Sequence, residues 1–181
     1  MSATAVTRLW QRMDRAERSL CLRINRGCHR DAVRGFFVVA SRLGDGYAWY
    51  VLIAVLAFTG GEAGTLLTLK MAVTGAVGAA LYKLLKRWLV RERPCVSHAG
   101  ILMGTAPLDR YSFPSGHTMH AVSFTMLAAS HDLTLALLLL PLTLAIAASR
   151  VLLGLHYPTD VVAGALIGAA LAAATLEFWP T

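Results

Sequence analysis

Apolar residues gather in long blocks along this chain, and polar residues are concentrated between the blocks. Five blocks stand out, at residues 47–60, 66–85, 117–130, 133–148 and 161–176. A helix rises 1.5 Å per residue, so about 20 apolar residues cross the hydrocarbon layer of a bilayer. The pattern predicts an all-α, integral membrane bundle of five to six helices, the sixth being a half-inserted helix over residues 32–42.

The first 34 residues follow a different pattern. They hold eight arginines against Asp14, Glu17 and Asp31, and they lack the apolar core of a cleaved signal peptide. Apolar residues recur at helical spacing, which predicts a basic amphipathic N-terminal helix. Such a helix either lies in the membrane interface or packs, solvated, on the body of the protein. We therefore expect two parts, a basic N-terminal segment (1–34) and a membrane-embedded domain (35–181).

Composition narrows the function classes. The chain of 181 residues is 56% hydrophobic and only 15% charged, which excludes intrinsic disorder and disfavours an ordinary soluble domain. A net charge of +7 makes anionic lipid or phosphate a candidate partner. Nucleic acid is not expected as a partner, because no motif or aromatic context supports it. The three cysteines form neither a disulfide framework nor a zinc motif.

Polar residues beside membrane helices mark functional sites, and here they cluster in three segments. The first runs from Lys86 to Pro94, where Lys86 and Arg93 stand seven apart and are expected to share one helical face. The second, residues 114–117, opens the third apolar block. Its Ser115 and Gly116 would present unpaired backbone N–H groups to an anion.

The third segment, residues 149–160, places His156 and Asp160 four apart, within reach on one helical face. Together the segments predict a phosphate site. The cations in them, Lys86, Arg93 and Arg150, can neutralise a phosphoryl group.

Two histidines supply the complementary roles of a displacement, one attacking phosphorus and the other protonating the leaving oxygen. Asp160 would hold the tautomer of His156 and stabilise its imidazolium, which favours His156 as nucleophile and His117 as acid. No carboxylate cluster is ready to hold Mg²⁺, so a mechanism without metal is the simpler hypothesis.

These motifs resemble the type-2 phosphatidic acid phosphatase superfamily, whose pattern is KxxxxxxRP, PSGH and SRxxxxxHxxxD. The resemblance covers residues from about 64 to 176 and leaves the first 46 outside. Every fixed position matches: Lys86, Arg93, Pro94, Pro114, Ser115, Gly116, His117, Ser149, Arg150, His156 and Asp160.

The resemblance implies a phosphohistidine on His156 that water hydrolyses, supported by Asp160, with His117 as general acid. It implies phosphate binding by the three cations, Ser115 and the Gly116 amide, and no metal or other cofactor. Membrane members act on lipid phosphates and diphosphates, and the bacterial phosphatidylglycerophosphate and undecaprenyl-diphosphate phosphatases are the nearest in type. The alternatives are a lipid-to-lipid phosphotransferase on the same fold and a non-catalytic lipid-phosphate transporter or binding protein.

Several remaining residues receive structural interpretations. Arg87 and Arg91 are expected to snorkel to headgroups, and the four tryptophans to sit in interfacial belts. His120 and His131 receive no role. Two small-xxx-small pairs, Gly75/Ala79 and Gly164/Gly168, predict close helix packing, within the chain or in an oligomer that nothing else in the sequence supports.

We expect a multi-pass protein of the cell membrane. All basic residues but Lys70 fall on the motif side, which favours a cytoplasmic site under the positive-inside rule. The resemblance favours the outer face, since most characterised relatives act there.

Overall fold

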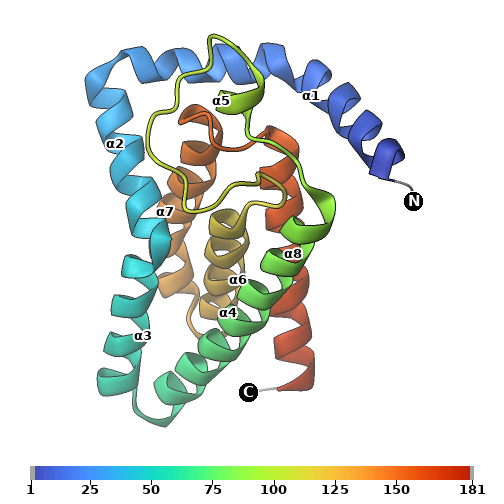
Figure 1. The fold of residues 1–181 in the computed structure, drawn as a ribbon. Helices are drawn as coiled ribbons and strands as arrows, with labels where there is room; N and C mark the ends of the chain where they lie inside the picture. The colour runs from blue at the N-terminus through green and yellow to red at the C-terminus, as the bar shows by residue number, and fades with distance from the viewer. Residues whose placement is uncertain (1–2, 180–181) are drawn as a thin grey trace.

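The chain folds as a bundle of helices, shown in Figure 1. The computed structural model describes residues 3–179, and within that range it contains helices and connecting segments but no strand. The elements are α1 (Ala3–Asn25), η1 (Arg26–His29), α2 (Asp31–Arg42), η2 (Leu43–Tyr47), α3 (Ala48–Thr59), α4 (Gly61–Leu89), α5 (Pro94–Ser97), α6 (Gly116–His131), α7 (Leu133–Leu152) and α8 (Pro158–Phe178).

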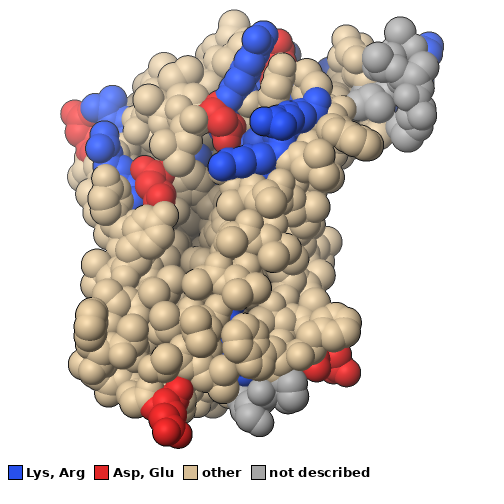
Figure 2. Space-filling view, turned by 60° about the horizontal axis from the view of Figure 1, so that its bottom comes forward, with Lys and Arg blue, Asp and Glu red and all other residues tan. Residues whose placement is uncertain are grey.

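The bundle is built for a membrane. Helices α7 and α8, and the stretch Gly61–Ser97 that contains α4, are long and apolar enough to cross one. Helix α6 packs among them, and α2 and α3 run along one side (Figure 1). Figure 2 shows ionisable side chains gathered at the two ends with a broad uncharged band between them. The prediction of an all-α membrane bundle with an N-terminal helix is confirmed.

Helix α2 lies where an extra helix was predicted, over residues 32–42, and it continues through a bend into α3. The polar residues Arg42 and Asp45 do not end the helix there. A π-helical turn, η2, carries the chain from α2 into α3. The bend is made at Gly46, whose φ of 129° lies in the region that only glycine adopts readily. The bent helix therefore brings Asp45 into the bundle instead of breaking the fold.

Helices α6 and α8 approach closely, as the Gly164/Gly168 pair predicted. A Cβ atom at Gly164 would lie 2.5 Å from the carbonyl oxygen of Ser115, and one at Gly168 would clash with the carbonyl oxygen of Met119. The N-termini of the two helices are also joined, because the Ser115 N–H donates to the Asp160 carbonyl oxygen at 3.0 Å. This contact brings the second and third motifs together.

The Gly75/Ala79 pair also lies where α4 meets α6: a Cβ atom at Gly75 would lie 3.0 Å from the Phe124 ring, and both residues line a cavity between α3, α4 and α6. The interfacial position predicted for Trp49 was wrong. Trp49 is 2% exposed and packs edge-on against Phe124 in the core, away from any interfacial belt. Hydropathy alone does not distinguish an aromatic ring that faces lipid from one that faces the bundle.

We expect Gly168→Ala to lower the melting temperature of the purified protein in detergent by several degrees. The added methyl group must displace the α6 backbone at Met119, and overpacking of this kind costs about 1–3 kcal/mol. Circular dichroism at 222 nm during heating measures the change. The matched control is Gly35→Ala, because a Cβ there has nothing within 4 Å. Equal melting temperatures for both variants would show that α6 and α8 can separate freely.

Candidate active site

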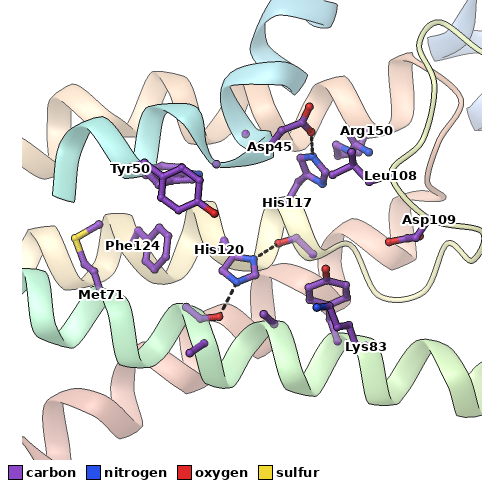
Figure 3. Close-up of a pocket in the computed structure, with 18 of the residues that line it drawn as sticks. Asp45, Tyr50, Met71, Lys83, Leu108, Asp109, His117, His120, Phe124 and Arg150 are labelled. Atoms are coloured by element: carbon purple, nitrogen blue, oxygen red, sulfur yellow. Dashed lines mark hydrogen bonds and ion pairs between the residues drawn. The ribbon is translucent and has the colours of Figure 1, made fainter. Parts of the chain in front are cut away.

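The three polar motifs meet at one cavity of about 600 Å³ between α3, α4 and α6. Its lining changes from one end to the other, as Figure 3 shows: charged side chains lie at one end, and Tyr50, Met71 and Phe124 lie at the other. His120 lies between these ends, with its ring nitrogens 2.8 Å from the Gly116 oxygen and 3.1 Å from the Gly75 oxygen. Among the predicted site residues, those that line the cavity are Lys86, Arg93, Gly116, His117, Arg150 and His156.

His156 lies in the turn between α7 and α8 and is 1% exposed. Its Nε2 is 3.2 Å from Nη1 of Arg93. A guanidinium only donates hydrogen bonds, so Nε2 must be the acceptor and the proton of the neutral ring lies on Nδ1. Burial, reinforced by Arg150 and Arg93, lowers the pKa of His156 well below its ordinary value. The ring is therefore neutral, with its lone pair on Nε2.

Asp160 stands behind His156, outside the cavity lining. Its Oδ2 is 3.6 Å from Nδ1 of His156 and accepts the Tyr157 backbone N–H at 2.8 Å. The pair spans the beginning of α8, because His156 precedes the first helical residue, Pro158. The prediction that they come together is confirmed by this distance, although they do not share one helical face. At 3.6 Å the contact is longer than a hydrogen bond and would have to tighten during a reaction.

His117 is the second residue of α6 and faces Asp45 of η2. The Nε2 of His117 is 2.5 Å from Oδ1 of Asp45 (Figure 3). A carboxylate accepts at this position, so Nε2 carries a proton; giving a proton to a leaving group requires the ring in its imidazolium form. Sequence analysis gave Asp45 no role, because the residue lies just before an apolar block and outside the three polar segments. Its position between Gly44 and Gly46 was the available signal.

Lys86 and Arg93 converge on the carboxylate of Asp109, to which sequence analysis gave no role. Asp109 accepts from Nζ of Lys86 at 2.7 and 2.8 Å, and from Nη2 of Arg93 at 2.6 Å. The two cations do not share a helical face, since α4 ends at Leu89 and Val90 takes a left-handed φ of 42°. The extended segment that follows carries Arg93 back to the cavity.

The guanidinium of Arg150 is only partly hydrogen-bonded. It is 2% exposed, and Nη1 donates to the Ser41 hydroxyl of α2. Its Nε has no hydrogen-bond partner among the described residues, and no described carboxylate forms an ion pair with it. A buried guanidinium in this state attracts an anion strongly.

Ser115 and Gly116 play different parts. Ser115 is fully buried, and its Oγ caps α6 by contacting the backbone N–H of Thr118 at 3.4 Å and the Thr118 hydroxyl at 3.0 Å. Its side chain is therefore occupied in holding the helix start, which faces the cavity at Gly116. The described residues contain no group of three or more His, Cys, Asp or Glu that could hold a metal ion.

Arg91 contradicts the expectation that it reaches the headgroups. It is 1% exposed and turns inward, donating to Oδ1 of Asp160 at 2.6 Å. Its neighbour Arg87 is exposed, as expected. The local sequence around these two arginines does not predict that one is buried and the other exposed, because the partners of Arg91 come from other parts of the chain.

Known proteins share this arrangement of helices and motifs. Residues 65–181 match the family model of the PAP2 superfamily. Lipid A 1-phosphatase from Rhizobium etli is 30% identical over 158 residues, which cover 76% of this chain and 67% of that protein. Decaprenylphosphoryl-5-phosphoribose phosphatase from Mycobacterium tuberculosis is 36% identical over 98 residues, covering 54% of this chain and 52% of that protein. The match thus spans about half the length of this second relative.

The fold agrees as well. The crystal structure of LpxE from Aquifex aeolicus superposes with a TM-score of 0.72 and 26% identity, covering 88% of this chain and 93% of that one. Sequence, family model and fold therefore lead to one conclusion: this chain belongs to the PAP2 superfamily.

Proposed function

We propose that this protein is a membrane lipid phosphatase that hydrolyses a phosphomonoester or diphosphate on a lipid through a phosphohistidine on His156. The observation that carries the proposal is the position of a neutral His156, whose Nε2 lone pair accepts from Arg93 Nη1 at 3.2 Å, at a cavity that also holds His117 and three buried cations. The relatives named above are phosphatases of lipid-linked phosphates, which supports the same class of substrate here.

The chemistry follows from the positions of these groups. Nε2 of His156 attacks phosphorus, the phosphorus–oxygen bond to the lipid breaks, and His117 gives its proton to the leaving oxygen. Water then attacks the phosphohistidine and returns a proton to His117, which releases orthophosphate and restores His156. Asp160 stabilises the imidazolium that forms when Nε2 bonds to phosphorus.

The cations bind the phosphoryl group and stabilise its charge in the transition state. Phosphate oxygens would take over the contacts that Asp109 makes with Lys86 and Arg93, and would satisfy the free Nε of Arg150. Three fixed positive charges in a buried site would stabilise the charge of the transition state, as a metal ion does in other phosphoryl-transfer enzymes. The proposed mechanism therefore uses no metal ion. The apolar end of the cavity would accept the first part of the lipid chain.

We expect the purified protein to release orthophosphate from a lipid phosphate in mixed micelles, equally well with EDTA present. The panel is phosphatidate, phosphatidylglycerophosphate, decaprenylphosphoryl-5-phosphoribose and undecaprenyl diphosphate, assayed one at a time. His156→Ala should lower the rate by about a thousandfold or more, because it removes the nucleophile. His131→Ala is the matched control, since that exposed histidine lies at the far end of α6.

Each alternative function gives a different result in this assay. Release that requires a second lipid as acceptor would identify a phosphotransferase. A His156→Ala protein that keeps its activity, or a parent protein that binds lipid phosphates without turnover, would identify a transporter or binding protein and overturn the proposal.

His117 is tested through the leaving group. We expect His117→Ala to slow hydrolysis of the lipid substrate by about 10²–10⁴-fold, because an alkoxide is expelled poorly without a proton. The loss on p-nitrophenyl phosphate should be far smaller, since nitrophenolate leaves unprotonated. The ratio of kcat/KM for the two substrates measures the difference. Equal losses on both would mean that His117 binds phosphate rather than donating a proton.

We also propose that the motif end of the bundle faces the cytoplasm, on the strength of its excess of basic residues. Val96 is exposed at that end, whereas Glu62 is exposed at the opposite end. In intact bacterial cells an impermeant maleimide should label Glu62→Cys and leave Val96→Cys unlabelled until the cells are lysed. Labelling of Val96→Cys before lysis would place the site outside.

A further inference from the structure

Arg91 is bound through every hydrogen-bond donor that it has. A guanidinium offers five N–H groups, and all five have an acceptor here. Asp14 accepts from Nε at 2.9 Å and from Nη2 at 2.8 Å, and Glu17 accepts from Nη2 at 2.8 Å. The Thr159 hydroxyl accepts from Nη1 at 2.7 Å, and Asp160 accepts from Nη1 at 2.6 Å. Arg91 therefore joins two carboxylates of α1 to the carboxylate behind His156.

One face of α1 packs around Arg91. Asp14 and Glu17 are three residues apart, so both point to the same side of α1. From the preceding turn, Trp10 places its ring 5.0 Å from the guanidinium and donates its indole N–H to the Leu89 carbonyl oxygen at 2.6 Å. The ring of Tyr157 lies 3.9 Å from the guanidinium. A flexible surface arginine would not be enclosed in this way.

Glu17 also reaches the beginning of α8 directly. One carboxylate oxygen accepts the backbone N–H of Thr159 at 2.8 Å, and the other accepts its hydroxyl at 2.7 Å. An acidic side chain at the first turn of a helix stabilises that turn through its unpaired N–H groups and the helix dipole. The turn that α1 holds in place is the turn that carries Asp160.

The position of Asp160 depends on these contacts. Arg91 holds Oδ1, and the Tyr157 N–H holds Oδ2, which is the oxygen that faces Nδ1 of His156. The charges of the network matter as well. If Arg91 had Asp160 as its only acidic partner, it would cancel the charge that His156 needs. With Asp14 and Glu17 present, the three carboxylates outnumber the arginine and the network keeps a negative excess beside the imidazole.

We propose that Asp14 and Glu17 of α1 are positioning residues for the proposed hydrolysis, acting through Arg91 to hold Asp160 against His156. Helix α1 is then a working part of the active site, although it lies outside the residues that match the family model. This inference rests on the proposed function, because the role of Asp160 has meaning only if His156 is the nucleophile.

The proposal predicts a specific kinetic signature. Asp14, Glu17 and Arg91 do not line the cavity, whereas Lys86 and Arg93 do. Loss of the α1 carboxylates should therefore lower kcat, which depends on the charge supporting His156. Both KM and the inhibition constant of orthophosphate should stay nearly constant, because the phosphate-binding cations are untouched.

The test uses the full-length protein in detergent with the lipid phosphate that it hydrolyses best. Asp14→Asn and Glu17→Gln keep size and remove charge, and each should lower kcat about tenfold with KM and the orthophosphate inhibition constant within about threefold of the parent. The double variant should lose more. Arg91→Lys keeps the charge but offers three donors on one atom, so it should lose kcat to a similar extent. Asp31→Asn is the control, because that residue pairs only with Arg34 at the surface.

Each result of these assays has a different interpretation. Unchanged kcat in the folded single variants would overturn the inference. A parallel loss of kcat and orthophosphate binding would also overturn it, by showing that α1 merely maintains the fold of the site. If the double variant does not fold, the single variants decide. A parent protein that releases no phosphate would instead refute the proposed function.

Discussion

A charge buried inside a membrane bundle has to be paired, and this requirement organises the functional end of the protein. Isolated buried charges carry a penalty of several kcal/mol, so cations are retained only with partners or for a ligand. Lys86 and Arg93 are paired through Asp109, and Arg91 through carboxylates of α1 and α8. Arg150 has a hydroxyl partner and an unpaired Nε among the described residues. The site is therefore electrostatically incomplete at one defined point, which the proposed phosphoryl group would complete.

Sequence analysis located the site because fixed residues at fixed spacing carry its chemistry. The bundle, the convergence of three motifs and the Gly164/Gly168 contact could all be predicted from single segments of the chain. Reasoning by helical periodicity failed for Lys86 and Arg93, since α4 ends between them and a left-handed Val90 redirects the chain. The pair still meets, because both cations bind one carboxylate from a distant loop.

The residues that sequence analysis missed share a property: each is defined by a partner far away in the chain. Asp45 contacts His117, which lies 72 residues later, and Arg91 contacts Asp14, which lies 77 residues earlier. Nothing in the local pattern distinguishes the buried Arg91 from the exposed Arg87. Spacing predicts what neighbours on one element can do together, whereas contacts between elements are settled by packing, here by the bend at Gly46 and by the position of α1 across the end of the bundle (Figure 1).

The N-terminal helix packs on the body of the protein, one of the two interpretations that its pattern allowed, and its place in the membrane interface stays a prediction. Its acidic residues Asp14 and Glu17 turn toward the body, while Arg12, Arg15 and Arg18 on the other faces are exposed. An exposed arginine face at the membrane end of the bundle suits anionic headgroups, and the acidic face suits the buried Arg91. The two functions do not compete, because helical periodicity assigns them to different sides. A helix that holds the catalytic carboxylate from behind and faces lipid headgroups in front would connect the membrane surface physically to the reacting histidine.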